Sequence, residues 1–124
     1  MKLNKLIPII YTGNVQDTLD FYLGNLGFIC TARTAEWASL SFDSVELMVS
    51  KPNDHFPFEG PNFTGSFYFN TNSVAEIWWR VKDKLRICYP IEDFVYGMRE
   101  FAVFDNNGYL LQFGQSISMS FSPP

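Results

Sequence analysis

Residues 96–115 read YGMREFAVFDNNGYLLQFGQ, and this stretch decides how the rest of the chain is interpreted. Two apolar runs, 99–104 and 109–113, flank a turn whose residue types tolerate positive φ, which predicts a β-hairpin. A second hairpin is predicted earlier, where strands 37–42 and 45–49 flank a shorter turn. Two copies spaced about 60 residues apart indicate a duplicated module, because a solenoid needs three or more short repeats.

A strand, a helix and another strand precede the first hairpin. Residues 6–11 are predicted as the first strand, Asn14 as the N-cap of the helix, and residues 28–34 as the next strand. The helix has one apolar face at helical spacing: Val15, Leu19, Tyr22 and Leu26. This half of the chain therefore reads β-α-β-β-β.

The second half repeats this order. Residues 66–70 alternate like a strand, Ser73 and Glu76 have the spacing of a capping box, and residues 86–89 read as a further strand. The helix between these strands has an apolar stripe: Val74, Ile77, Trp78, Val81 and Leu85. The two hairpins also align in letters: Phe42-Asp43 corresponds to Phe104-Asp105.

The predicted fold class is α+β, with two β-α-β-β-β modules in a single domain over residues 1–124. Module one covers about 4–50, module two about 65–115, and residues 116–124 form a C-terminal tail. The linker 51–64 is long for a connection inside a compact domain, which predicts a function or a packing partner for it. Three phenylalanines of the linker are expected to pack on the same chain or on a second subunit: Phe56, Phe58 and Phe63.

The composition describes a folded domain with a small negative charge. Of the 124 residues, 47% are hydrophobic and 18% are charged, which excludes general disorder, and the net charge of −4 argues against nucleic acid as a partner. No apolar run is long enough to span a membrane, and the first residues do not read as a secretory signal. Cys30 and Cys88 are too few for a disulfide framework, so we expect reduced thiols and a cytoplasmic location.

Three segments carry a resemblance to a known family: FYLGNLGF (21–28), ELMVSKP (46–52) and residues 96–115. In this order they resemble the glyoxalase/bleomycin-resistance/extradiol-dioxygenase superfamily, also called vicinal oxygen chelate proteins. A G-M-R-E-F-A run followed by D-x-x-G-x-L-L is typical of its bleomycin-resistance-like branch. The resemblance implies a curved mixed sheet around a concave cleft, with the helices outside, and a homodimer with clefts at the subunit interface.

Metal-using members of the superfamily hold a divalent ion with His and Glu side chains from fixed strand positions. The resemblance places these positions at Ile7, Met48, Ser66 and Gln112. Isoleucine has no donor atom, methionine suits soft ions, and a neutral serine or glutamine is a weak ligand. The single histidine, His55, lies in the predicted linker. We therefore expect no metal and no other cofactor.

The two-residue period of a strand predicts which side chains line the cleft. Residues that share a parity with the family positions face the same side, which places Arg99, Phe101 and Val103 beside Gln112. Tyr96 stands where the bleomycin-resistance branch usually has tryptophan, and its ring can stack on a planar ligand. The predicted ligand-binding residues are Trp37, Ser39, Glu46, Met48, Tyr68, Tyr96, Arg99, Phe101 and Gln112. The acidic candidates for a cationic ligand are Glu46, Glu92, Asp93 and Glu100.

These observations favour a metal-independent, non-catalytic homodimer that sequesters a planar or cationic small molecule, as bleomycin-resistance proteins do. The alternative is an enzyme of the same superfamily, a glyoxalase-type lyase or a dioxygenase that uses a divalent metal. A third possibility is a scaffold whose cleft is filled by its own side chains. Metal analysis together with restoration of activity by added nickel, zinc, manganese or iron separates the first two, since stoichiometric metal with turnover would identify the enzyme.

Overall fold

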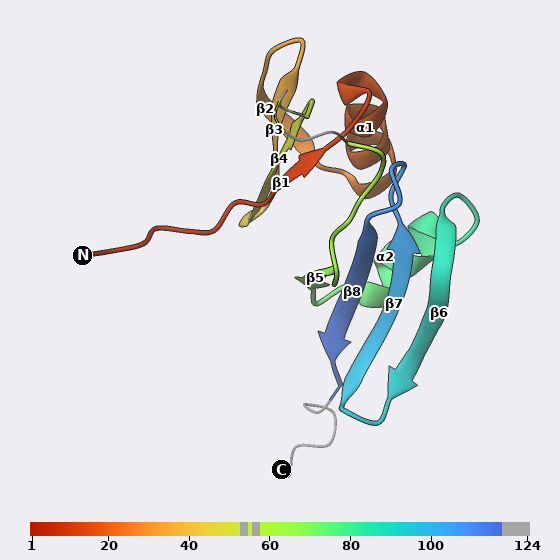
Figure 1. Ribbon diagram of the computed structural model, residues 1–124. Helices are drawn as coiled ribbons and strands as arrows, with labels where there is room; N and C mark the ends of the chain where they lie inside the picture. The colour runs from red at the N-terminus through yellow and green to blue at the C-terminus, as the bar shows by residue number, and fades with distance from the viewer. Residues whose placement is uncertain (53–54, 56–57, 118–124) are drawn as a thin grey trace. The chain divides into compact units, whose positions relative to one another are not determined.

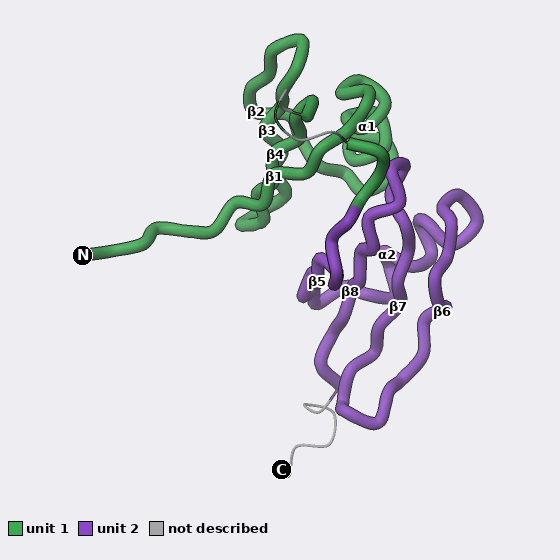
Figure 2. The backbone as a smooth tube through the Cα atoms, in the orientation of Figure 1, with its two compact units in different colours: residues 1–61 green, residues 62–124 purple. Residues whose placement is uncertain are grey.

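The computed structural model describes residues 1–52, 55 and 58–117 of the chain. It consists of two compact units, residues 1–61 and 62–124, which Figure 2 shows in two colours. Phe56 of the predicted linker and residues 118–124 of the predicted tail lie outside the described residues. Among the residues that are described, no helix has the length and hydropathy needed to cross a bilayer.

Unit 1 holds one helical segment and a four-stranded mixed sheet (Figure 1). Its elements are β1 (Ile9–Tyr11), α1 (Val15–Phe21), the π-helical turn η1 (Tyr22–Leu26), β2 (Ile29–Arg33), β3 (Trp37–Phe42) and β4 (Val45–Ser50). The strand order is β1-β4-β3-β2, in which β1 runs parallel to β4 and the other neighbours are antiparallel.

The first helix begins and ends as local chemistry predicts. The side chain of Asn14 caps it by accepting a hydrogen bond from the backbone N–H of Asp17 at 2.9 Å. The helical segment ends at Leu26, followed by Gly27 with φ of 85°, a conformation that favours glycine.

Unit 2 repeats the same order of elements. It contains β5 (Phe67–Asn70), α2 (Val74–Val81), β6 (Arg86–Phe94), β7 (Met98–Phe104) and β8 (Leu110–Ser116). The strand order is β5-β8-β7-β6, with β5 parallel to β8 and the other neighbours antiparallel (Figure 1). The α+β fold class with two β-α-β-β-β modules is therefore confirmed.

Two local predictions in unit 2 are wrong. Ser73 makes no side-chain capping bond; instead, the backbone N–H of Val74 donates to Oε1 of Gln115 at 3.0 Å, so a residue of β8 caps α2. Strand β6 extends to Phe94, well past the predicted end at residue 89, and shifts of register accommodate Pro90.

Each sheet has one face packed under its helix. In unit 1 this face is aliphatic, and its residues are at most 3% exposed: Ile10, Leu40, Leu47 and Val49. In unit 2 it is largely aromatic, because the ring of Trp78 on α2 packs against Phe101, and Phe101 stacks on Phe113. Burial of these apolar side chains is the main source of stability in each unit.

The turn between β7 and β8 confirms the hairpin that residues 96–115 predicted. A carboxylate oxygen of Asp105 accepts hydrogen bonds from the backbone N–H groups of Asn107, Gly108 and Tyr109 at 2.9, 3.0 and 2.9 Å. Gly108 has φ of 99°, which a residue with a side chain rarely adopts. The hairpin is thus fixed by its own turn residues.

Candidate functional site

A buried carboxylate lies on the sheet face of unit 2 that is opposite α2. Glu100, in the middle of β7, is only 2% exposed. The hydroxyl of Tyr68 on β5 donates to its Oε1 at 3.0 Å, and the hydroxyl of Tyr89 on β6 donates to its Oε2. Both oxygens therefore act as acceptors, as in an ionised carboxylate.

A glutamine and a serine extend this network. Nε2 of Gln112 donates to the hydroxyl oxygen of Tyr89 at 2.8 Å and lies 3.5 Å from Oε2 of Glu100. The hydroxyl of Ser66 donates to Oε1 of Gln112. We call these five residues, Ser66, Tyr68, Tyr89, Glu100 and Gln112, the tyrosine–carboxylate cluster.

Strand register brings the cluster together. Gln112 of β8 is paired with Tyr68 of β5 on one side and with Ala102 of β7 on the other, and Tyr89 of β6 is also paired with Ala102. Paired residues of neighbouring strands point to the same face of a sheet. Glu100 lies two residues from Ala102 on β7 and therefore shares this face.

The position of the Tyr68 ring depends on a glycine. Gly114 of β8 is buried and is paired with Glu100 of β7. A Cβ atom at residue 114 would overlap the hydroxyl of Tyr68, so the phenol lies directly over the bare backbone. Gly114 therefore allows Tyr68 to reach across β8 to Glu100.

The surroundings keep the phenols of the cluster protonated. Burial, the hydrogen bond to Glu100 and the charge of Glu100 raise the pKa of Tyr68 to about 12. Burial and the same carboxylate raise the pKa of Tyr89 well above its ordinary value, against an opposing hydrogen bond from Gln112. Among the residues that the structure describes, no ion pair includes Glu100. Within the described part of the chain, the negative charge of Glu100 is thus met by neutral donors.

Exposed aromatic rings lie beside the cluster. Tyr96, 60% exposed, stacks on Phe94 with ring centroids 5.4 Å apart, and Phe94 meets the ring of Tyr89 edge-on at 5.6 Å. Desolvation and then hydrogen bonding to Glu100 raise the pKa of Tyr96, so its phenol also responds to the buried carboxylate. Tyr68 is itself 45% exposed. A ligand on this face would meet aromatic surface above a buried negative charge.

A sequence model described as the glyoxalase/bleomycin resistance protein/dioxygenase superfamily matches residues 2–113. The chain belongs to this superfamily. Among curated proteins, none matches it in sequence.

Solved structures share the fold at low sequence identity. A glyoxalase/bleomycin resistance protein/dioxygenase from Alicyclobacillus acidocaldarius matches with a TM-score of 0.75 and 16% identity, over 97% of this chain and 96% of that one. TioX from Micromonospora sp. ML1 matches with a TM-score of 0.72 and 19% identity, over 91% and 96%. A lactoylglutathione lyase from Agrobacterium tumefaciens matches with a TM-score of 0.73 and 15% identity, over 93% and 96%.

Of the ligand-binding residues predicted in unit 2 of this superfamily member, Tyr68 and Gln112 belong to the cluster and Tyr96 lies beside it. The predicted face of β7 is wrong. Because Ala102 is paired with Gln112, the alternate residues Arg99, Phe101 and Val103 point to the opposite face.

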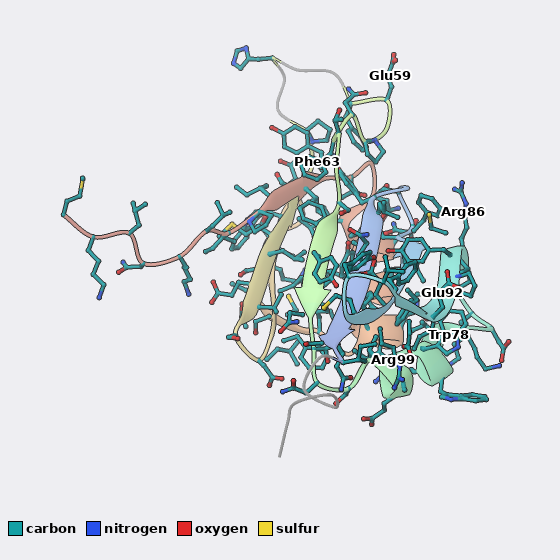
Figure 3. All side chains as sticks on the ribbon, turned by 90° about the horizontal axis from the view of Figure 1, so that it is seen from below. Glu59, Phe63, Trp78, Arg86, Glu92 and Arg99 are labelled. Atoms are coloured by element: carbon teal, nitrogen blue, oxygen red, sulfur yellow. The ribbon has the colours of Figure 1, made fainter. Side chains whose placement is uncertain are left out.

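Phe101 and Arg99, the two β7 residues predicted to bind ligand, have other contacts. Phe101 is fully buried against Trp78 of α2 and against Phe113. Arg99 of β7, labelled in Figure 3, is exposed and donates two hydrogen bonds to the carboxylate of Asp93, at 2.7 and 3.1 Å. The guanidinium of Arg99 lowers the pKa of Asp93.

The predicted residues of unit 1 share one face of its sheet, as the alternation predicted. Met48 is paired with Ser39, and Trp37 lies two residues from Ser39, all of them half-buried and opposite the aliphatic core. Glu46 lies on the same face and pairs with Lys5 at 2.7 Å. Within the described part of unit 1, no hydrogen-bonded cluster like that of unit 2 involves these residues.

Sequence reasoning missed Tyr89 and did not place Glu100 at the centre of a site. Two small residues in the strands could have indicated where the cluster lies, because Ala102 and Gly114 share a sheet face with the large side chains of Tyr89 and Glu100. A glycine inside a strand often marks a close approach by another group.

The donor set does not fit the divalent ion that metal-using members of the superfamily hold. Within residues 1–52, 55 and 58–117, no three His, Cys, Asp or Glu side chains come together. Ser66 and Gln112 are hydrogen-bonded to each other, and Met48 and Ile7 offer no oxygen or nitrogen side-chain donor. We derive no step through a metal.

Proposed function

We propose that this chain is a cytoplasmic, metal-independent binding protein that sequesters a planar, cationic organic ligand, in the manner of bleomycin-resistance proteins. The observation that carries the proposal is the buried charge of Glu100, which has no cationic partner in the described residues and lies beneath exposed tyrosines. A buried carboxylate attracts a cation most strongly where water is excluded. Sequestration needs no covalent step.

The aromatic rings beside the cluster support a planar ligand. Tyr96 and Phe94 are nearly parallel, with 13° between their planes, so a flat ligand can continue this stack on the exposed ring. A cation over a tyrosine ring gains further from the ring quadrupole. The net charge of −4 adds a weak attraction in the same direction.

We also propose that the protein acts as a homodimer with its ligand cleft at the subunit interface. The support is the resemblance to bleomycin-resistance proteins, whose small members pair in this way. Sedimentation analysis with and without ligand tests it: a dimer that the ligand stabilises supports the proposal, and a monomer that binds ligand with full affinity contradicts it.

The binding proposal is tested by thermal-shift and calorimetric titration with bleomycin and a panel of cationic aromatic compounds. We expect stoichiometric binding, weakened about fivefold by Tyr96→Ala because one ring contact is lost. The control is Trp79→Ala, which removes a ring that is 70% exposed on α2, on the other side of the sheet. A lack of response to every compound contradicts the proposal, as does tight stoichiometric metal together with turnover of a substrate.

A further inference from the structure

We infer that the tyrosine–carboxylate cluster selects ligands by their N–H groups: the Tyr68 hydroxyl oxygen accepts a hydrogen bond from an amidinium, guanidinium or protonated aminoheterocycle. This inference rests on the proposed function and narrows it from any planar or cationic compound to one that donates hydrogen bonds.

Tyr68 has one hydroxyl proton, and it donates this proton in its hydrogen bond to Glu100. The donated bond is 3.0 Å long, and Glu100 is an acceptor only, so the Tyr68 oxygen keeps its lone pairs for other donors. No other donor of the described residues reaches this oxygen. In contrast, the Tyr89 oxygen already accepts from Gln112. Tyr68 is also 45% exposed, so a ligand can reach it.

The buried carboxylate makes this oxygen a better acceptor. A hydroxyl that donates to an anion is polarised, and its oxygen then accepts more strongly. Tyr89 and Gln112 hold the second oxygen of Glu100, which keeps its first oxygen directed at Tyr68. The proton of Tyr68 therefore stays directed at Glu100, and the oxygen remains an acceptor for a ligand donor.

Gly114 is a positioning residue for this acceptor. Any side chain at residue 114 would overlap the Tyr68 hydroxyl, so the phenol keeps its place only over glycine. The same arrangement disfavours anions, because a ligand carboxylate would meet lone pairs and the charge of Glu100. A cation without N–H groups would gain only ring contacts.

The test uses three probes of one ring each: benzamidinium, phenyltrimethylammonium and benzoate. We expect benzamidinium to bind wild-type protein about tenfold more tightly than phenyltrimethylammonium, and benzoate not to bind, since a hydrogen bond from a charged donor to a neutral hydroxyl oxygen accounts for such a factor. Tyr68→Phe and Gly114→Ala should both remove the preference for benzamidinium. Trp79→Phe on α2 should retain it.

Calorimetry and ligand-observed NMR at millimolar probe measure these affinities, and circular dichroism confirms that each variant is folded. Equal binding of the two cations, or binding of benzoate, overturns the inference while leaving the proposed function in place. A preference that survives both Tyr68→Phe and Gly114→Ala also overturns it. Failure of both cations to bind overturns the inference, and the proposed function falls with it only if bleomycin and the panel of cationic aromatic compounds also fail to bind.

Discussion

The two units have the same strand order and the same parallel pairing of first and last strands, but they differ on the sheet face opposite the helix. Register identifies the corresponding positions, because Met48 is paired with Ile9 and Ser39 as Gln112 is paired with Tyr68 and Ala102. Written with unit 1 first, the corresponding residues are Ile9 and Tyr68, Trp37 and Glu100, Met48 and Gln112, and Ser50 and Gly114.

This difference shows which features the two β-α-β-β-β modules share. The helix-side face is apolar in both units, aliphatic in one and aromatic in the other, because burial requires only apolar side chains of suitable volume. The opposite face has no such constraint. In unit 2 it carries a hydrogen-bonded polar cluster, and in unit 1 it carries Ile9, 57% exposed, and a surface ion pair of Glu46 with Lys5.

The largest expected difference between the units comes from their carboxylates. Glu100→Ala should lower the free energy of unfolding by about 3 kcal/mol, because hydrogen bonds to a charged acceptor contribute about 1.5–3 kcal/mol each. Glu46→Ala, on the same face of unit 1, should cost less than about 1 kcal/mol, because its partner Lys5 is exposed. Urea unfolding measures both. Equal losses would show that the cluster does not distinguish the two units.

The next difference concerns the paired positions Gly114 and Ser50. Gly114→Ala should cost about 2 kcal/mol, because Tyr68 must swing away and give up its hydrogen bond to Glu100. Ser50→Ala should change stability by less than about 0.5 kcal/mol, since the Ser50 hydroxyl donates only to a neighbouring exposed carbonyl. Chemical denaturation of both variants checks this, and a neutral Gly114→Ala would place the Tyr68 ring elsewhere.

Because the pKa of Tyr68 is raised, unit 2 should lose stability at alkaline pH. A pKa raised from 10 to about 12 means that Tyr68 binds its proton more tightly in the folded state, so its contribution is complete below pH 10 and is lost as pH rises through about 12. Tyr68→Phe should lose less stability over this interval than wild type. Met48→Gln, a change in unit 1, should follow the wild-type curve. Urea midpoints measured across the interval provide the comparison, and identical curves for all three proteins would contradict it.

The smallest effects should come from surface ion pairs, and here the units should not differ. Asp93→Asn breaks the exposed pair with Arg99, and Lys5→Gln breaks the pair with Glu46. Arg99 lowers the pKa of Asp93 from 3.8, so that contribution is present above this value and is lost as pH falls. Thermal unfolding at low and high salt should show small losses that salt removes. A large loss of thermal stability in either variant would contradict this prediction, because it would show that a surface ion pair contributes substantially to the stability of its unit.

Most of the fold could be predicted from apolar periodicity and turn chemistry, since both act over a few residues. The predicted strand 37–42 coincides with β3, and Asn14 caps α1 as expected. The face of β7 could not be predicted from matching letters. Similar letters align Phe42 with Phe104, whereas the strand register aligns Ser41 with Phe104. The two alignments differ because the hairpins differ in length: five residues separate the paired Phe104 and Leu110, and four separate the paired Ser41 and Glu46.

A one-residue offset moves every side chain of a strand to the other face. This offset explains why Phe101 was expected in the site and why Glu100 was not expected at its centre. The cluster itself was beyond prediction for a different reason. Its hydrogen bonds join residues far apart in the chain, such as Ser66 with Gln112 and Tyr68 with Glu100, and no local pattern records such pairings.

The parallel pairing of first and last strands has a consequence for the order in which unit 2 assembles. The β7–β8 hairpin closes over a short loop, whereas β5 pairs with β8 across all the intervening elements, so we expect this distant pairing to form late in folding. Strand β5 is also a four-residue edge strand and so can detach without melting its neighbours. Because β5 carries Tyr68, we expect the amide protons of β5 to exchange with solvent faster than those of β7. Each detachment of β5 would briefly admit water to the carboxylate of Glu100.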